Sequence, residues 1–164
     1  MSLMSVSDLL VYQAIVNVIA DQVHLRLATH ENEHVLGNIY AGPGKRWMLK
    51  QWKQQYNRYI DKIERIYKLG NPWIASTDIG AFYDTIDHER VLLLIQEYCW
   101  PDERFIQLFL NCLSKWAAHK TNLAMSRGIP QGSNASDFLA NLFLHDIDRT
   151  LISKKPFEKW QEVK

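Results

Sequence analysis

The segment Ser76–His88, STDIGAFYDTIDH, carries the most information about the fold and the chemistry of this chain. It overlaps a short apolar run, residues 73–79, whose composition predicts a buried strand. Asp78 lies at the end of that predicted strand, and the aromatic pair Phe82 and Tyr83 follows. A carboxylate at a strand end is held rigidly yet stays accessible, which suits a ligand of a hard cation such as Mg²⁺. In the simpler interpretation, Asp78 caps a turn and the aromatic pair belongs to the core.

Helical periodicity dominates the rest of the chain, with apolar residues at spacings of three and four between capping residues or Gly and Pro. The predicted helices cover residues 6–27 with Ser7 or Asp8 as the cap, 45–69, 88–99 with Asp87 as the cap, a stretch that begins at 101–102, and one that opens at Ser133 or Ser136. The expected apolar face of the first helix contains Leu9, Leu10, Ala14, Ile15, Val18 and Ile19. We therefore expect an α+β fold that is mostly helical, with few short strands.

Size and composition indicate one globular unit. The chain has 164 residues, of which 47% are hydrophobic and 23% charged, enough apolar material for a core. No uninterrupted apolar run approaches the roughly 20 residues of a membrane span, so no membrane partner is expected. The first residues lack the features of a secretory signal, and Cys99 and Cys112 have no metal-binding or redox spacing. These features favour a reducing compartment, the cytoplasm.

Charge is distributed unevenly along a chain whose net charge is only +1. Between residues 45 and 68, eight basic residues are opposed only by Asp61 and Glu64. A local positive field of this kind attracts phosphates, although a solvated helix face has the same appearance in a sequence. The candidate nucleic-acid-binding residues are Lys45, Arg46, Lys50, Lys53 and Arg58.

A second informative segment is Ser126–Asp148, SRGIPQGSNASDFLANLFLHDID. Its Gly-Ile-Pro-Gln-Gly turn leads into a predicted helix and places the Gln131 side chain beside a helix start. Such an arrangement can order a nucleotide or a template base through hydrogen bonds and helix-terminal amides. By itself, the pattern fits equally well a turn whose glutamine is solvated.

Together the two segments resemble the reverse transcriptase family of RNA-directed DNA polymerases. STDIGAFYDTIDH is similar to motif A of that family, GIPQGSNASDFLANLFL is similar to motif B, and Asp8–Ala20, DLLVYQAIVNVIA, resembles a fingers block of bacterial members. The resemblance implies partial fingers and palm of a right-hand polymerase. Residues 1–72 would form a fingers-like part with the basic helix 45–69, and residues 73–164 a partial palm that carries motifs A and B.

The resemblance also implies roles for single residues. Asp78 and the backbone carbonyl of Ile79 would bind catalytic metal, two Mg²⁺ (or Mn²⁺) ions in the complete enzyme. Tyr83 would lie under the sugar of the incoming deoxynucleotide and disfavour a 2′-hydroxyl. The remaining nucleotide-binding residues, which contact the triphosphate, the base or the template, would be Ala81, Phe82, Pro130, Gln131 and Gly132. The implied partners are an RNA or DNA template-primer and deoxynucleoside triphosphates.

Two departures from the family pattern qualify the resemblance. The chain has no Asp-Asp pair, so the aromatic-x-Asp-Asp of motif C is missing, as is the thumb. We therefore expect a central polymerase fragment that is inactive as it stands and that self-associates through an unpaired palm edge. Asp137 stands where intron-encoded members have proline after serine, a feature that resembles the defence-associated, abortive-infection branch. The branch stays open, with retron-like or group II intron-like members as alternatives.

Two other functions compete with this interpretation. One is a non-catalytic, polymerase-like module that binds nucleic acid. The other is a zinc metalloprotease, because His30–His34, HENEH, satisfies the H-E-x-x-H pattern. That segment lies where helical periodicity breaks, which favours a polar loop. The remaining histidines are expected at caps or on the surface: His24, His88, His119 and His145.

Overall fold

The computed structural model describes residues 4–28, 33–99, 102–117 and 126–153. The helices of these residues are α1 (Val6–Leu27), α2 (Trp52–Lys68), α3 (Phe82–Thr85), α4 (His88–Cys99), α5 (Glu103–Trp116) and α6 (Asn134–Ser153). The β pairing in these ranges includes isolated bridges, Tyr40 with Leu49 and Asp87 with Arg127. The mostly helical class is confirmed, whereas the described residues do not show a sheet that would make the fold α+β.

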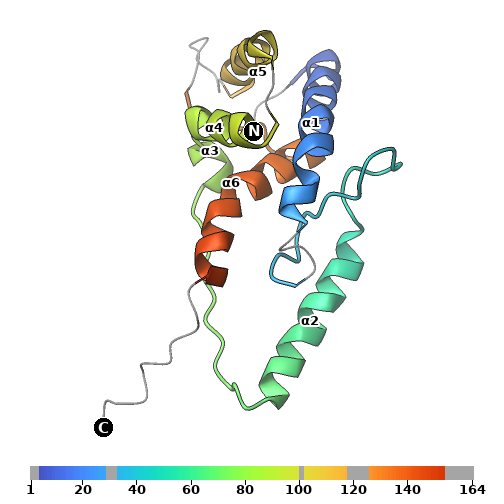
Figure 1. Cartoon of the computed structure of the whole chain (residues 1–164), viewed down its shortest axis with the longest axis vertical. Helices are drawn as coiled ribbons and strands as arrows, with labels where there is room; N and C mark the ends of the chain where they lie inside the picture. The colour runs from blue at the N-terminus through green and yellow to red at the C-terminus, as the bar shows by residue number, and fades with distance from the viewer. Residues whose placement is uncertain (1–3, 29–32, 100–101, 118–125, 154–164) are drawn as a thin grey trace.

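Four of the helices form one core. Helix α1 packs against α4 and α6, and α5 packs against α4 (Figure 1). The largest side chains in this core include Tyr12, Phe109 and Phe138, all fully buried. The Tyr12 ring meets Trp116 edge-on at a centroid distance of 5.2 Å, and Arg90 of α4 forms an ion pair with Asp146 of α6. We name α1, α4, α5 and α6 the helical cluster.

Side-chain caps determine where several helices begin. Asp87 accepts a hydrogen bond from the Arg90 backbone N–H at 3.1 Å, as the sequence predicts for the helix at 88–99. Asp102 caps α5 in the same way, and Ser133 accepts from the Ser136 N–H at 3.2 Å before α6. The cap of α1 is Ser5, so the prediction of Ser7 or Asp8 is wrong by a few residues.

The buried face of α1 matches the expected one only in part, at Ile15 and Ile19. Leu9, Leu10 and Val18 are exposed, whereas the buried residues are Tyr12, Ile15, Val16, Ile19, Ala20, Val23 and Leu27. The helix is apolar around much of its circumference, so periodicity alone did not select a face. Packing against α4 and α6 selects it. By length and composition α1 is also the described helix that could cross a membrane, a test that core helices of soluble proteins pass as well.

The basic helix starts later than predicted. Helix α2 begins at Trp52, because the preceding residues pair with the chain upstream: the Ala41 N–H donates to the Met48 carbonyl and the Lys50 N–H to the Ile39 carbonyl, both at 2.8 Å. Gly42 and Gly44 have positive φ angles of 104° and 68° and turn the chain between the paired segments. Residues 45–51 therefore belong to a hairpin-like loop.

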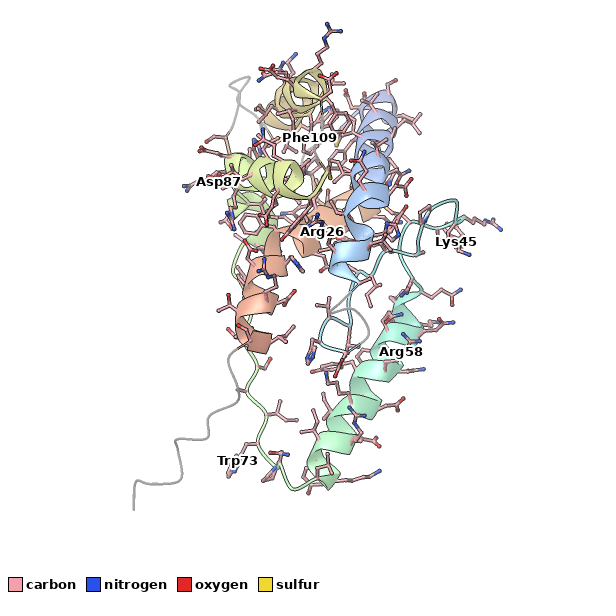
Figure 2. The ribbon with its side chains drawn as sticks, in the orientation of Figure 1. Arg26, Lys45, Arg58, Trp73, Asp87 and Phe109 are labelled. Carbon is pink, nitrogen blue, oxygen red and sulfur yellow. The ribbon has the colours of Figure 1, made fainter. Side chains whose placement is uncertain are left out.

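The apolar run at 73–79 is not a buried strand. These residues are extended and exposed, and Trp73 retains 91% of its accessible surface. Helix α2 and this segment extend away from the helical cluster, and the Trp73 side chain lies far from it (Figures 1 and 2). A strand needs a neighbour to pair its backbone groups, and no described residue supplies a ladder here.

Candidate functional site

The two informative segments of the sequence lie side by side. The Gly128 N–H donates to the Ile86 carbonyl at 2.8 Å, and the Ile129 N–H donates to the Tyr83 carbonyl at 2.9 Å. One residue pair further along, the His88 N–H donates to the Ser126 carbonyl at 3.0 Å. This backbone pairing joins the end of motif A to the turn that opens motif B. We call it the A–B junction.

Gly128 is at the centre of the A–B junction. Its φ of +92° lies in the region that favours glycine, and a Cβ here would be 3.5 Å from the Asp84 carbonyl oxygen. Its own carbonyl accepts a hydrogen bond from Nε2 of His88 at 2.6 Å. An alanine at position 128 would therefore strain the backbone conformation but would not cause a steric clash.

His88 is buried, with 2% of its surface exposed, and not at the surface as expected. Burial lowers the pKa of the imidazole, which outweighs the opposite influence of the Gly128 carbonyl and Asp87. His145 is buried as well, with its ring against Tyr98, whereas His119 lies outside the described residues. The signal for His88 was its position directly after the capping residue Asp87, where a side chain can reach back to a neighbouring loop.

Polar side chains also cross the A–B junction. Gln131 Nε2 donates to Asp84 Oδ1 at 3.2 Å on the exposed side. The Tyr83 hydroxyl donates to Asp137 Oδ1 at 2.6 Å. Burial first, and the Asp137 carboxylate second, raise the pKa of this phenol, so Tyr83 stays protonated as a donor. The structure thus brings together Tyr83, Gln131 and Asp137, the residue at which the sequence differs from the family pattern.

The aromatic pair of motif A is anchored to α6. Phe82 packs against Phe143 of α6 with a ring-centroid distance of 6.1 Å, and against Tyr83 at 5.9 Å. Ala81 precedes them with a left-handed φ of 51°, a conformation that is costly for alanine. The Asp84 N–H donates to the Ala81 carbonyl at 3.0 Å and closes the turn. Pro130 is buried beside the junction, and Gly132 is exposed.

The proposed metal ligands stand apart from these contacts. Asp78 and Ile79 are both exposed in the extended segment before Ala81. Within the part of the chain that the structure describes, no group of three or more His, Cys, Asp or Glu residues could hold a metal ion. One accessible carboxylate is a suitable donor for Mg²⁺ but is not a complete centre. The described residues therefore do not fit a two-metal site.

The candidate nucleic-acid-binding residues are spread over three surfaces. Lys45 and Arg46 lie in the hairpin-like loop, Lys53 and Arg58 on α2 (Figure 2). Lys50 lines a groove of about 730 Å³ between that loop, α2 and the start of α6. The groove is rich in aromatic side chains, which the sequence interleaves with the basic residues: Trp47, Trp52, Tyr56 and Tyr59. We name it the aromatic groove; Asp137 is part of its wall.

The zinc-protease interpretation has no support from the described residues. His30 and Glu31 lie outside them, and His34 lies in a turn rather than on a helix. The H-E-x-x-H chemistry needs both histidines on one helical face. The polar-loop interpretation is confirmed for Glu33 and His34.

Comparison with protein families gives one clear match. The family described as reverse transcriptase (RNA-dependent DNA polymerase) matches residues 11–162. The chain belongs to the reverse transcriptase family. The matched region includes the A–B junction, the aromatic groove and the exposed segment between α2 and α3. No solved structure matches the chain.

Several curated proteins are similar to about half of this reverse transcriptase chain. The group II intron-encoded protein LtrA of Lactococcus lactis is 35% identical over 91 residues, which is 52% of this chain and 14% of LtrA. An uncharacterized 91 kDa protein in the cob intron of Schizosaccharomyces pombe is 33% identical over 87 residues, 52% of this chain and 11% of that protein. Escherichia coli YkfC is 32% identical over 82 residues, 48% of this chain and 21% of YkfC. The chain thus spans between about a tenth and a fifth of these relatives' lengths.

Proposed function

We propose that this chain forms the nucleotide-contacting part of an RNA-directed DNA polymerase that adds deoxynucleotides to a primer 3′-hydroxyl. The observation that carries the proposal is the A–B junction, where the Tyr83 carbonyl accepts from the Ile129 N–H and the Gln131 side chain donates to Asp84, the residue after Tyr83. Two short segments about 45 residues apart, both similar to polymerase motifs, meet there through three backbone hydrogen bonds.

In this proposal the ring of Tyr83 lies under the sugar, and Gln131 with Pro130 and Gly132 contacts the base and the template. The backbone amides of Ala81 and Phe82 face the triphosphate. Asp78, with the carbonyl of Ile79, supplies one ligand set for Mg²⁺ (or Mn²⁺). Because the chain has no Asp-Asp pair and the described residues hold no group of three metal-binding side chains, we propose that the 164-residue chain does not polymerise DNA by itself.

We further propose that the template-primer follows the basic residues and the aromatic groove. Lys45, Arg46, Lys53 and Arg58 are exposed and can approach phosphates. Aromatic side chains such as Trp47 and Tyr56 offer faces on which unpaired bases stack. Basic residues paired with neighbouring rings, as Lys53 is with Trp52 at 5.8 Å, combine both contacts.

The deciding experiment is primer extension by the full-length protein that carries this sequence, with and without an added RNA template. We expect incorporation of deoxynucleotides that is lost in Asp78→Asn and strongly reduced in Gln131→Ala, and unchanged in the exposed control Glu97→Gln. Sequencing the products shows whether the template was copied. Absence of incorporation by the unaltered protein would reject the polymerase proposal.

A non-catalytic binding module is the second candidate, because the described residues hold no complete metal centre. The two proposals differ in their metal dependence. Template-primer binding by the chain that is tight and insensitive to divalent metal, in a full-length protein without incorporation, would favour the module.

We also propose that the 164-residue chain self-associates. Apolar side chains on α2 and in the segment after it, among them Trp52, Tyr56, Tyr67 and Trp73, are exposed. Light scattering across a concentration series measures the mass directly. A monomer at every concentration would contradict this part of the proposal.

A further inference from the structure

The start of α6 is held firmly against the core. Ser136 is buried, and its hydroxyl lies 3.0 Å from the Tyr12 hydroxyl of α1 and contacts the Pro130 carbonyl. The next residue, Asp137, donates its backbone N–H to the Ser133 carbonyl at 3.1 Å. Because these bonds join α6 to α1 and to the turn before α6, the backbone of Asp137 has little freedom to move.

The Asp137 carboxylate connects this rigid helix start to motif A. It accepts the hydrogen bond of the Tyr83 hydroxyl at 2.6 Å, across 54 positions of sequence. A hydrogen bond to an ionised group is stronger than one between neutral groups. A negative charge in the first turn of a helix is also favoured by the helix dipole. Proline at this position, which the family resemblance leads one to expect, could not accept such a bond.

Tyr83 is held along its length. Its backbone carbonyl is bonded to Ile129, and its ring touches Phe82 edge-on and packs against the core. The bond to Asp137 anchors the hydroxyl end of the ring. Asp137 also forms part of the wall of the aromatic groove.

We propose that Asp137 is a positioning residue that holds the Tyr83 ring in place and thereby determines how well the enzyme distinguishes deoxyribose from ribose. This inference rests on the proposed function, in which Tyr83 lies under the sugar. A ring excludes a 2′-hydroxyl only if it does not move away when the hydroxyl contacts it. The hydrogen bond to Asp137, whose backbone is held on α6, keeps the Tyr83 ring from moving.

The test compares sugar selectivity in the full-length protein. For each variant, kcat/KM is measured for a deoxyribonucleoside triphosphate and for the ribonucleoside triphosphate of the same base. Asp137→Asn keeps the shape but weakens the acceptor, Tyr83→Phe keeps the ring but removes the donor, and Glu97→Gln is the matched control for loss of one carboxylate. Because a hydrogen bond to a charged group is lost, we expect Asp137→Asn and Tyr83→Phe each to lower selectivity about tenfold.

The double variant decides whether Asp137 acts through Tyr83. If it does, Asp137→Asn in the Tyr83→Phe background lowers selectivity no further. Additive losses, or equal losses of kcat/KM for both sugars, would overturn the inference, because a general structural role predicts them. Incorporation by the unaltered protein with unchanged selectivity in Asp137→Asn overturns the inference alone, whereas no incorporation by the unaltered protein overturns the proposed function and the inference with it.

A second readout does not need activity. In the 164-residue chain with ¹³Cζ-labelled tyrosine, the Tyr83 resonance, assigned with Tyr83→Phe, reports on its hydroxyl. We expect this resonance to shift in Asp137→Asn and to keep its position in Glu97→Gln. An unchanged resonance in Asp137→Asn would show that the bond is not made and would overturn the inference.

Discussion

The helical cluster and the α2 arm (α2 with the exposed segment 69–80) both contain aromatic and aliphatic side chains, but these side chains have opposite surroundings. In the cluster, side chains such as Tyr12 and Phe138 are fully buried between four helices. In the α2 arm, Trp52 and Trp73 face outward, and Gln55 is the buried residue of α2. A helix satisfies its own backbone, so α2 forms with few packing contacts; a strand does not, and residues 73–79 are extended with no strand pairing among the described residues. Apolar content therefore predicts burial only where another element completes the surface.

The largest effect on stability is expected from a cavity in the helical cluster. We expect Phe138→Ala to lower the free energy of unfolding by about 3–5 kcal/mol, since it removes a buried aromatic ring. Urea denaturation followed by circular dichroism measures the change. Tyr67→Ala is the matched control, because Tyr67 is an exposed aromatic residue of α2, and a loss as large there would contradict the contrast.

Gly128→Ala tests the A–B junction, which ties motif A to motif B at the edge of the cluster. The positive φ of Gly128 is unfavourable for alanine, whereas the space for a Cβ is adequate. We expect a loss of about 1–3 kcal/mol in the free energy of unfolding. Gly37→Ala is the comparison, because Gly37 has no positive φ and open space around it. If both variants lost the same amount, backbone conformation would not be the cause.

His88 makes the stability of the junction depend on pH. Its pKa lies below the ordinary value of 6.5 in the folded chain, so the unfolded chain binds a proton that the folded site does not. We expect the contribution of the neutral His88 side chain to the free energy of unfolding to be fully present above pH 6.5 and to decrease as the pH falls below 6.5. Urea midpoints of the wild type and His88→Gln at about pH 7.5 and about pH 5.5 measure it. The wild type should lose more stability than the variant, and an equal loss in both would show that His88 does not carry the effect.

The smallest effect is expected in the α2 arm. Trp73→Ala should change the free energy of unfolding by less than about 0.5 kcal/mol, because the side chain loses almost no solvent contact on folding. Emission of this tryptophan should also match that of a solvated indole. A loss above about 1 kcal/mol would mean that the α2 arm is packed after all.

Local rules predicted much of the helical part. The ends of α1 and α4, and the caps Asp87 and Ser133, follow from side chains that bond to the nearest backbone groups. The predictions that were wrong concern segments whose structure depends on residues far away in the sequence. The expected strand at 73–79 lacks a neighbour, and the start of α2 moved because residues 39–50 pair across a glycine turn.

The candidate site was predictable to a similar extent. The motifs indicated Tyr83 and Gln131, and the structure brings their segments together. The bond from Tyr83 to Asp137 spans 54 positions, and no sequence spacing rule identifies such a pair. Asp137 was visible only as an unexpected residue within a motif. For His88, the position directly after the cap Asp87 was a signal, but its partner Gly128, 40 positions away, could not be identified from the sequence.

The exposed segment between α2 and α3 has a consequence for limited proteolysis. A protease that cuts near Trp73 would separate α1 and α2 from α3–α6 in the covalent chain, but the interface of α1 with α4 and α6 would remain. The two pieces should then migrate together in native chromatography and separate only in denaturant. Residues 4–72 and 73–153, produced as separate polypeptides, should accordingly reassemble, with α1 completing from one piece the core that the other leaves open (Figure 1).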